Sequence, residues 1–393
     1  MFKSLSPAQL DPILSLSIAY REDPRDNKID LGVGVYRNSL GETPIMQAVQ
    51  LAEQRLIKTQ TTKSYVSLAG SEVFNQSMMD LLLSDTSAHS RAAAVQTPGA
   101  SGALRMLADL IQVAQPDTTV WLTNPSYVNH KPVMEAAGLK VKYYPYFEPE
   151  TKQVNSDAML KEIAKAGPKD VVLLHGCCHN PTGADITFAD WQAITALANK
   201  NGFMPFVDMA YLGFGDGLEQ DGAGLKYMAD NIEEMVVATS CSKNFGLYRE
   251  RTGAAIIISN SQQEAQKAKG RVLTLARSSY TMPPDHGAAL VADILNDQQL
   301  TTIWKDELYT MHSRILTLRQ GLTQAIRQRG SEQFDFIEQH KGMFSVTGLT
   351  PEQILTVRKK YGIYAVGDGR INIAGLQEQH IDHLADALVS VSR

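Results

Sequence analysis

Residues 235–246 read Met-Val-Val-Ala-Thr-Ser-Cys-Ser-Lys-Asn-Phe-Gly, and this stretch decides the fold. Its first five residues form an apolar, β-branched run of the length of a buried strand, and the rest are small, polar or turn-forming. A lysine directly after a buried strand is uncommon, because a charged ammonium is costly to remove from water. Taken alone, the segment fits equally well a strand that ends in a loop with Lys243 on the surface.

Similar strands lie on both sides of this stretch and alternate with amphipathic helices. The further strand candidates are Ala92–Gln96, Thr119–Leu122, Val171–Leu174, Met204–Asp208 and Ala254–Ile258. Residues 102–111 show the helical period between two of them, with Leu104, Leu107, Ala108 and Ile111 on one face. The alternation predicts an α/β fold: a large domain whose mostly parallel sheet lies between helices.

The C-terminal part predicts a second, smaller α/β domain. Its expected elements are a long helix over 300–330, a strand Met343–Val346, a helix from Pro351, a hairpin of Tyr364–Val366 with Ile371–Ile373, and a last helix striped by Ile381, Leu384, Ala385 and Leu388. We therefore expect an N-terminal arm and part of the small domain in residues 1–42. The large domain would take residues 43–305 and the small C-terminal domain residues 306–393.

Composition narrows the class of protein. The 393 residues carry a net charge of -5, with 44% hydrophobic and 20% charged residues, which is typical of a globular protein and gives no reason to expect nucleic acid or membrane as a partner. No signal peptide or transmembrane stretch is visible, so we expect a cytoplasmic protein. The three cysteines, Cys177, Cys178 and Cys241, suggest buried thiols rather than disulfides, and we expect no metal.

Two segments favour binding of a phosphate group. Thr97-Pro-Gly-Ala-Ser-Gly102 joins a strand to a helix, where small residues, free N–H groups and the Ser101 hydroxyl suit an anion. Ser240 and Arg251, on either side of Lys243, could hold a dianion close to that amine. Desolvation and a nearby cation would keep the amine of Lys243 neutral and nucleophilic. A tight turn with Ser101 as helix N-cap remains the alternative for the first segment.

Three further side chains are expected at the same edge of the sheet. Asp208 closes an apolar strand and could pair with a pyridinium nitrogen, with Tyr211 donating to the ring oxygen; alternatively, the carboxylate accepts backbone N–H groups. Asn180 lies in the turn His179-Asn-Pro-Thr-Gly183, which by itself indicates no function. Arg370, which begins a strand of the small domain, could bind a carboxylate through both prongs or lie on the surface.

Together these segments resemble one family, the fold-type I pyridoxal 5′-phosphate (PLP) enzymes, and within it the class I aspartate and aromatic amino-acid transaminases. The most specific motifs are 175–183, His-Gly-Cys-Cys-His-Asn-Pro-Thr-Gly, and 240–248, Ser-Cys-Ser-Lys-Asn-Phe-Gly-Leu-Tyr. The resemblance extends from Asp11-Pro-Ile-Leu14 and Leu31-Gly-Val-Gly-Val-Tyr36, which contains Gly34, to Gly369–Gly375. It covers nearly the whole chain.

The resemblance implies roles for individual residues. Lys243 would hold PLP as a Schiff base and act as general base, Asp208 would pair with the pyridinium, and His130 would support Asp208. The remaining cofactor ligands would be Ala100, Ser101, Tyr127, Asn180, Tyr211, Ser240, Arg251 and, from the neighbouring subunit, Tyr65. Substrate would contact Gly34, Tyr127, Asn180, Arg370 at its α-carboxylate, and Arg277 of the other subunit at a distal carboxylate. The family forms homodimers with shared active sites.

Departures from the usual family pattern bear on the substrate. Tyr127 replaces the common stacking Trp, Met282 replaces the Asn of aspartate enzymes, and Ser101 and Ser64 also differ from them, whereas Thr43 matches them. A more apolar pocket favours a transaminase that moves amino groups from Phe, Tyr, Trp, aspartate and glutamate to acceptors such as 2-oxoglutarate. A strict aspartate transaminase is the main alternative. A non-catalytic amino-acid sensor or another PLP reaction, such as decarboxylation or racemisation, is less well supported.

Overall fold

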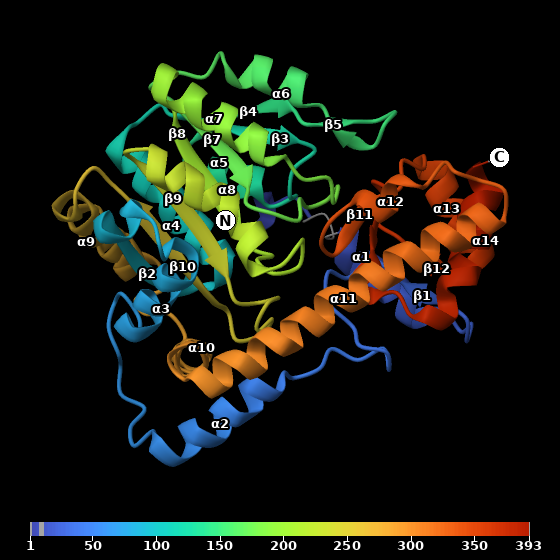
Figure 1. The fold of residues 1–393 in the computed structure, drawn as a ribbon, viewed down its shortest axis with the longest axis horizontal. Coiled ribbons are helices and arrows are strands. Elements are labelled where there is room, and N and C mark those ends of the chain that lie inside the picture. Colours follow the sequence, from blue (N-terminus) through green and yellow to red (C-terminus); the bar gives the residue numbers. More distant parts are fainter. Residues whose placement is uncertain (1, 8–11, 393) are drawn as a thin grey trace.

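The computed structural model describes residues 2–7 and 12–392. Asp11, part of the N-terminal motif quoted above, lies outside the described residues. So do Met1 and Arg393, the first residue of the predicted arm and the last residue of the predicted small domain. Figure 1 shows a larger and a smaller body connected by one long helix, α11 (Gln298–Gln328). The domain boundary expected at residue 305 falls inside this helix, so the division at 42 and 305 stays a prediction.

A seven-stranded sheet forms the centre of the larger body, in the order β2-β10-β9-β8-β7-β3-β4. Its strands are β2 (Ala92–Pro98), β3 (Thr119–Asn124), β4 (Lys140–Pro145), β7 (Asp170–His175), β8 (Met204–Met209), β9 (Met235–Ser240) and β10 (Thr252–Ile258). All neighbours pair in parallel except β10, which is antiparallel to β2 and β9. The six predicted strands and the mostly parallel sheet are thus confirmed, and the edge strand β4 was not predicted.

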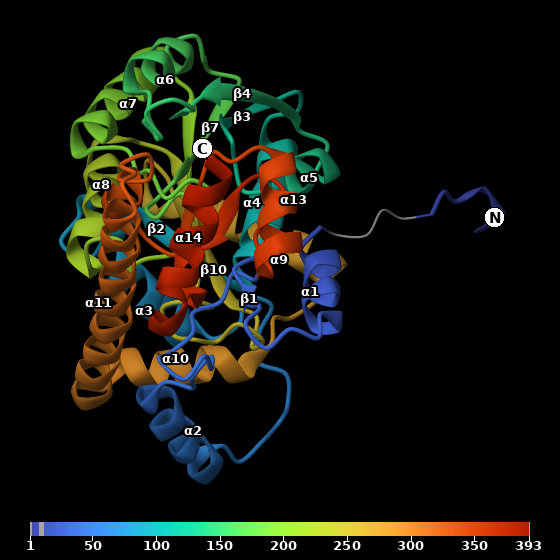
Figure 2. The ribbon, with the colours of Figure 1, turned by 90° about the vertical axis from the view of Figure 1, so that its right-hand side faces the viewer.

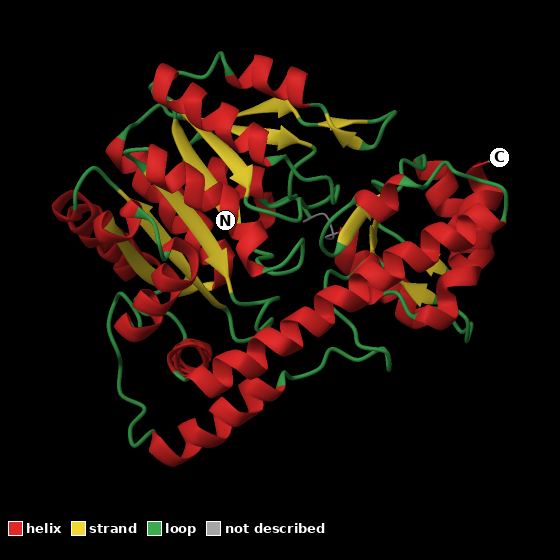
Figure 3. Ribbon diagram, viewed as in Figure 1, coloured by secondary structure: helices red, strands yellow, loops and turns green. Residues whose placement is uncertain are grey.

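Helices cover both faces of this sheet (Figure 3). They are α3 (Glu72–Leu83), α4 (Gly99–Ala114), α5 (His130–Ala136), α6 (Ser156–Ile163), α7 (Phe188–Asn201), α8 (Leu218–Asn231), α9 (Gln262–Ser279) and α10 (Asp285–Asn296). Successive strand residues face opposite sides, so Val171 and Leu173 join the apolar cluster with α4 and α9, whereas Val172 joins the cluster with α3, α7 and α8. Burial on both faces explains the uninterrupted apolar runs in the sequence.

The smaller body contains the last elements of the chain and part of its beginning. Its elements are α12 (Phe336–Gln339), β11 (Phe344–Val346), α13 (Pro351–Tyr361), β12 (Ile363–Tyr364), β13 (Arg370–Asn372), α14 (Ile381–Ser392), α1 (Pro12–Glu22) and β1 (Ile29–Asp30). The hairpin predicted between Tyr364–Val366 and Ile371–Ile373 is wrong. Instead β12 pairs in parallel with β1, and β13 pairs with β11. The turn exists, but partners distant in sequence take both strands.

Several segments project from the two bodies. Residues 2–7 lie apart from the rest and α2 (Gln47–Thr59) protrudes below it (Figure 2). The hairpin of β5 (Phe147–Glu148) and β6 (Gln153–Val154) extends from the larger body toward the smaller one (Figure 1). Short 3-10 helices span Phe2–Ser4, Ser87–Arg91, Ile373–Gly375 and Glu378–His380. Within the described residues, no helix has the length and apolarity needed to cross a membrane.

Candidate active site

A cavity of about 260 Å³ opens where the parallel strands end, between the two bodies. The predicted site residues among its lining are Gly34, Ala100, Ser101, Tyr127, Asn180, Asp208, Tyr211, Ser240, Lys243, Arg251 and Arg370. Lining residues outside the predicted set are Ile13, Leu104, His175, Cys177, Ala210, Ser242, Tyr248 and Phe344. The carboxyl ends of β2, β3, β7, β8 and β9 and a segment of the smaller body therefore meet at one place, as expected for an α/β sheet.

Asp208, the next-to-last residue of β8, has a buried carboxylate of which only one oxygen accepts a hydrogen bond from the described residues. Its Oδ2 accepts a hydrogen bond from His130 Nε2 at 2.8 Å, and His130 Nδ1 lies 2.9 Å from Ser126 Oγ. Its Oδ1 has no hydrogen-bond partner among the described residues. Burial opposes ionisation, but the hydrogen bond and charge of His130, with His175 and Lys243, hold the pKa of Asp208 below its usual value. The site thus contains a carboxylate with one oxygen available to a cation.

Lys243 lies in the turn after β9, where its half-buried side chain faces the cavity. Its Nζ lies 4.8 Å from the centre of the Tyr211 ring. Burial lowers the pKa of Lys243 to about 8; the charge of Asp208 opposes this shift and that of Arg251 adds to it. An amine with such a pKa is partly neutral near pH 7 and can act as a nucleophile or base.

Tyr211 and Asn180 form a polar pair at the side of the cavity. Asn180 Nδ2 donates to the Tyr211 hydroxyl at 3.3 Å, which leaves the phenol proton free to point into the cavity. Burial raises the pKa of Tyr211, so the phenol stays protonated and is a donor. If Asn180 served only to form the turn, its hydrogen bond to Tyr211 inside the cavity would have no explanation.

The first turn of α4 and the Arg251 guanidinium form an anion-binding corner. No side chain caps α4, because Pro98 precedes it and Ser101 lies inside its first turn; the N-cap alternative for Ser101 is therefore wrong. A Cβ on Gly99 would lie 2.7 Å from Arg251 Nη2, so only glycine lets the guanidinium approach the helix start. Ser240 ends the adjacent strand β9. Free helix N–H groups beside an arginine are suited to a phosphate.

Arg370 begins β13 and is buried at the opposite side of the cavity. Its Nη1 donates to Asn180 Oδ1 at 3.3 Å and its Nη2 to the Gly32 carbonyl at 3.0 Å. Its Nε has no hydrogen-bond partner among the described residues, and the guanidinium lies 4.6 Å from the Phe344 ring centre. The surface alternative for Arg370 is wrong, and the group is available to a carboxylate.

Of three further residues implied by the resemblance, one lines the cavity of its own chain and two do not. Tyr127 lines the cavity with its ring edge-on to His130, 5.3 Å between centres. Tyr65 is 89% exposed and Arg277 lies exposed at the end of α9; neither lines the cavity. Neither Tyr65 nor Arg277 therefore reaches the cavity of its own chain.

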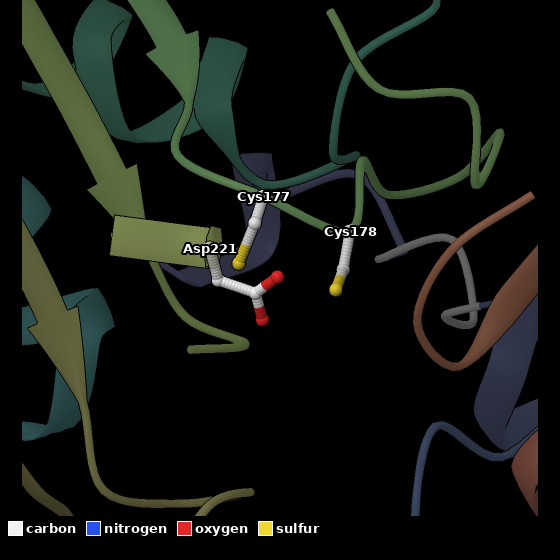
Figure 4. Close-up of side chains that lie close together, drawn as sticks. All are labelled: Cys177, Cys178 and Asp221. Carbon is white, nitrogen blue, oxygen red and sulfur yellow. The ribbon is translucent and has the colours of Figure 1, made fainter. Parts of the chain in front are cut away.

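Cys177, Cys178 and Asp221 bring three possible metal-ligand atoms within 4.8 Å of one another (Figure 4). The Asp221 carboxylate, however, already accepts backbone hydrogen bonds at 2.7–2.9 Å from Gly213, Gly215 and Asp216. Burial raises the pKa of Cys178 to about 12, so this thiol is protonated. The contacts explain the cluster as part of the loop structure, and we assign no ion to it.

Four of the additional lining residues, His175, Cys177, Ser242 and Tyr248, had a signal in the sequence. All four stand inside the two most specific motifs, and Tyr248 Oη accepts a hydrogen bond from the Tyr36 N–H at 2.9 Å. Phe344 lies in a predicted strand, but only the pairing of β11 with β13 brings it to Arg370. No local pattern indicates such a contact between segments so distant in sequence.

Comparisons with known proteins agree with this geometry. Residues 26–388 match the model of the family described as "Aminotransferase class I and II". The chain is 45% identical to the aromatic-amino-acid aminotransferase of Paracoccus denitrificans and 42% identical to the aspartate aminotransferase of Escherichia coli, each over 100% of both chains. A crystal structure of the aromatic-amino-acid aminotransferase of Burkholderia pseudomallei, covalently bound to pyridoxal phosphate, superposes with a TM-score of 0.98 at 37% identity over 100% of both chains. The chain belongs to the class I and II aminotransferase family.

Proposed function

We propose that this protein is a PLP-dependent transaminase that moves amino groups from aromatic amino acids and from aspartate or glutamate to 2-oxo acids. One observation carries the proposal: Lys243, the half-satisfied Asp208 and the carboxylate-binding Arg370 line a single cavity. The relatives named above divide between aromatic and aspartate aminotransferases, which supports both substrate classes.

The residues present fit PLP. The unpartnered Oδ1 of Asp208 suits a protonated ring nitrogen, and the protonated Tyr211 with Asn180 suits a ring oxygen. The uncapped start of α4, Ser240 and Arg251 suit the phosphate. When bound, PLP supplies an aldehyde that binds amines covalently and a pyridinium ring that takes up electrons.

The chain's own groups then have distinct tasks. Arg370 would bind and orient the substrate α-carboxylate, and Asn180 fixes Arg370 at 3.3 Å. The neutral Nζ of Lys243 would accept the proton that leaves the substrate Cα and would deliver it to C4′ of the cofactor. Asp208, held by His130, would keep the ring nitrogen protonated.

We also propose a cytoplasmic homodimer in which Tyr65 and Arg277 serve the partner's site. Both side chains are exposed and outside the cavity of their own chain, as that role requires. The exposed apolar side chains of residues 2–7 and α2, including Phe2, Leu5 and Ile57, support an arm and helix that pack on another subunit.

Substrate range is tested by comparing kcat/KM for phenylalanine and aspartate with 2-oxoglutarate as acceptor. We expect efficient turnover of both, because Met282, in place of the Asn of aspartate enzymes, would make the side-chain region more apolar while Arg277 would bind a distal carboxylate. Arg277→Ala should lower kcat/KM for aspartate by about 10²-fold and leave phenylalanine nearly unchanged, since only aspartate loses a charged contact. A kcat/KM for phenylalanine thousands of fold below that for aspartate would favour the strict aspartate enzyme, and Thr43 is the residue that matches that type.

The lowered pKa of Lys243 predicts a pH dependence for cofactor capture. As pH rises through about 8, the amine loses its proton, so covalent capture of added PLP by cofactor-free protein should accelerate and then level off. An ordinary lysine would continue to accelerate to about pH 10. Stopped-flow absorbance of the bound cofactor checks this, and a midpoint near 10 would contradict the buried, desolvated amine.

A further inference from the structure

Arg319, in the C-terminal half of α11, is fully buried, and its side-chain hydrogen bonds go to one short segment, residues 337–345. The acceptors are the carbonyl oxygens of Ile337 (2.9 Å), Lys341 (3.2 Å), Gly342 (2.7 Å) and Phe344 (2.7 Å) and the hydroxyl of Ser345 (2.7 Å). These are neutral oxygens, so the guanidinium fixes backbone geometry instead of neutralising an acid. Such a buried charge is costly unless its acceptors stay in place.

His340 continues this set of bonds to the larger body. Its Nε2 lies 2.7 Å from the carbonyl oxygen of Lys152, in the β5–β6 hairpin, and its Nδ1 lies 3.0 Å from Ser345 Oγ. A carbonyl only accepts, so Nε2 carries the proton and Nδ1 accepts from the Ser345 hydroxyl. Arg319 therefore donates to Ser345, Ser345 donates to His340, and His340 donates to the Lys152 carbonyl. Burial lowers the pKa of His340 to about 4, which agrees with a neutral ring.

The segment held in this way forms one wall of the cavity. Strand β11 pairs with β13, so that Val346 lies opposite Arg370. The Phe344 ring lies 4.6 Å from the Arg370 guanidinium and 6.0 Å from the Tyr211 ring. Displacement of β11 would therefore move both the ring under Arg370 and the strand that carries it.

We infer that Arg319, Ser345 and His340 are positioning residues for substrate carboxylate binding. The hydrogen-bond chain from Arg319 through Ser345 and His340 to the Lys152 carbonyl fixes β11 against the β5–β6 hairpin. Because β11 pairs with β13, it also holds Arg370 where it contacts Asn180. The inference rests on the function proposed above and adds to it a connection between the hairpin and the carboxylate site. Figure 1 shows the hairpin extending toward α12 and β11, where this connection is made.

The test replaces His340 by leucine in the holoenzyme and measures kcat and KM for phenylalanine and for 2-oxoglutarate. Loss of the bond to Lys152 should raise both KM values about tenfold, because both substrates carry a carboxylate beside the reacting carbon, while kcat changes less than about threefold. His340→Gln, which retains a donor for the carbonyl, should restore most of the loss. Ser345→Ala should act like His340→Leu, because it removes the middle of the hydrogen-bond chain.

His383→Leu is the matched control, since His383 Nε2 donates to the Tyr361 carbonyl at 2.7 Å outside this hydrogen-bond chain. It should leave both KM values unchanged. Unchanged kinetics in His340→Leu, a fall in kcat at constant KM, or an equal effect of His383→Leu would overturn the inference. If His340→Leu does not fold, Ser345→Ala decides by the same criteria. Absence of turnover in the unaltered protein would instead refute the proposed function.

Discussion

Lys243→Ala is expected to abolish transamination, with kcat falling at least about 10⁴-fold. Within the cavity, Lys243 places its amine over the Tyr211 ring and near Asp208, and burial lowers its pKa to about 8. Alanine removes both the covalent attachment of PLP and the base that moves the substrate proton. Steady-state assays with phenylalanine and aspartate measure the loss, and borohydride reduction of the wild-type holoenzyme should fix the cofactor to Lys243 alone.

The matched control is Lys140→Ala, because Lys140 lies exposed on the edge strand β4 and forms an ion pair with Asp117 at the surface. It should retain wild-type kcat and the absorbance of bound cofactor. A reduced cofactor found on a lysine other than Lys243, or a Lys243→Ala enzyme with more than about a hundredth of wild-type kcat, would contradict the assignment.

How much could be predicted from the sequence depended on how local the signal was. The six predicted strands could be recognised because burial on both faces makes them continuous apolar runs, as in Met235–Thr239. Strand β4 was missed because most of its side chains, including Tyr143, are exposed, so Lys140–Pro145 shows no such run. The hairpin prediction around Tyr364 was wrong because β1, more than 300 residues away, offers a better partner.

The residues of the candidate site divide in the same way, into those with a local signal and those without. The local signal is a polar side chain at the end of a strand or the start of a helix, as at Lys243, Asp208 and Ser101, and it already indicates a common edge of the sheet. Phe344 and the bonds of Arg319 had no such signal, since they depend on how the smaller body packs against the larger one. Tyr65 and Arg277 could be proposed only from the resemblance, because their roles require a second subunit.

Asp208→Asn should have the second large effect, a fall in kcat of about 10²–10⁴-fold. Asn keeps an oxygen for the His130 hydrogen bond but removes the charge that would pair with the ring nitrogen. Loss of one partner of a buried ion pair costs about 3–5 kcal/mol, which corresponds to this range. Because the pKa of Asp208 lies below its usual value, the wild-type carboxylate is ionised throughout the neutral range, and the loss should persist from pH 6 to 9 within about a factor of three.

Two further measurements separate loss of charge from loss of structure. Asp208→Glu keeps the charge at a shifted position and should recover part of kcat, whereas Asp117→Asn, which alters an exposed carboxylate, should behave as wild type. A PLP analogue whose ring nitrogen is methylated carries a permanent positive charge and needs no proton there. It should therefore raise kcat of Asp208→Asn, because the carboxylate's task is to keep that nitrogen cationic. Failure of the analogue to do so, with the variant folded and the analogue bound, would show that Asp208 acts mainly through the position of His130.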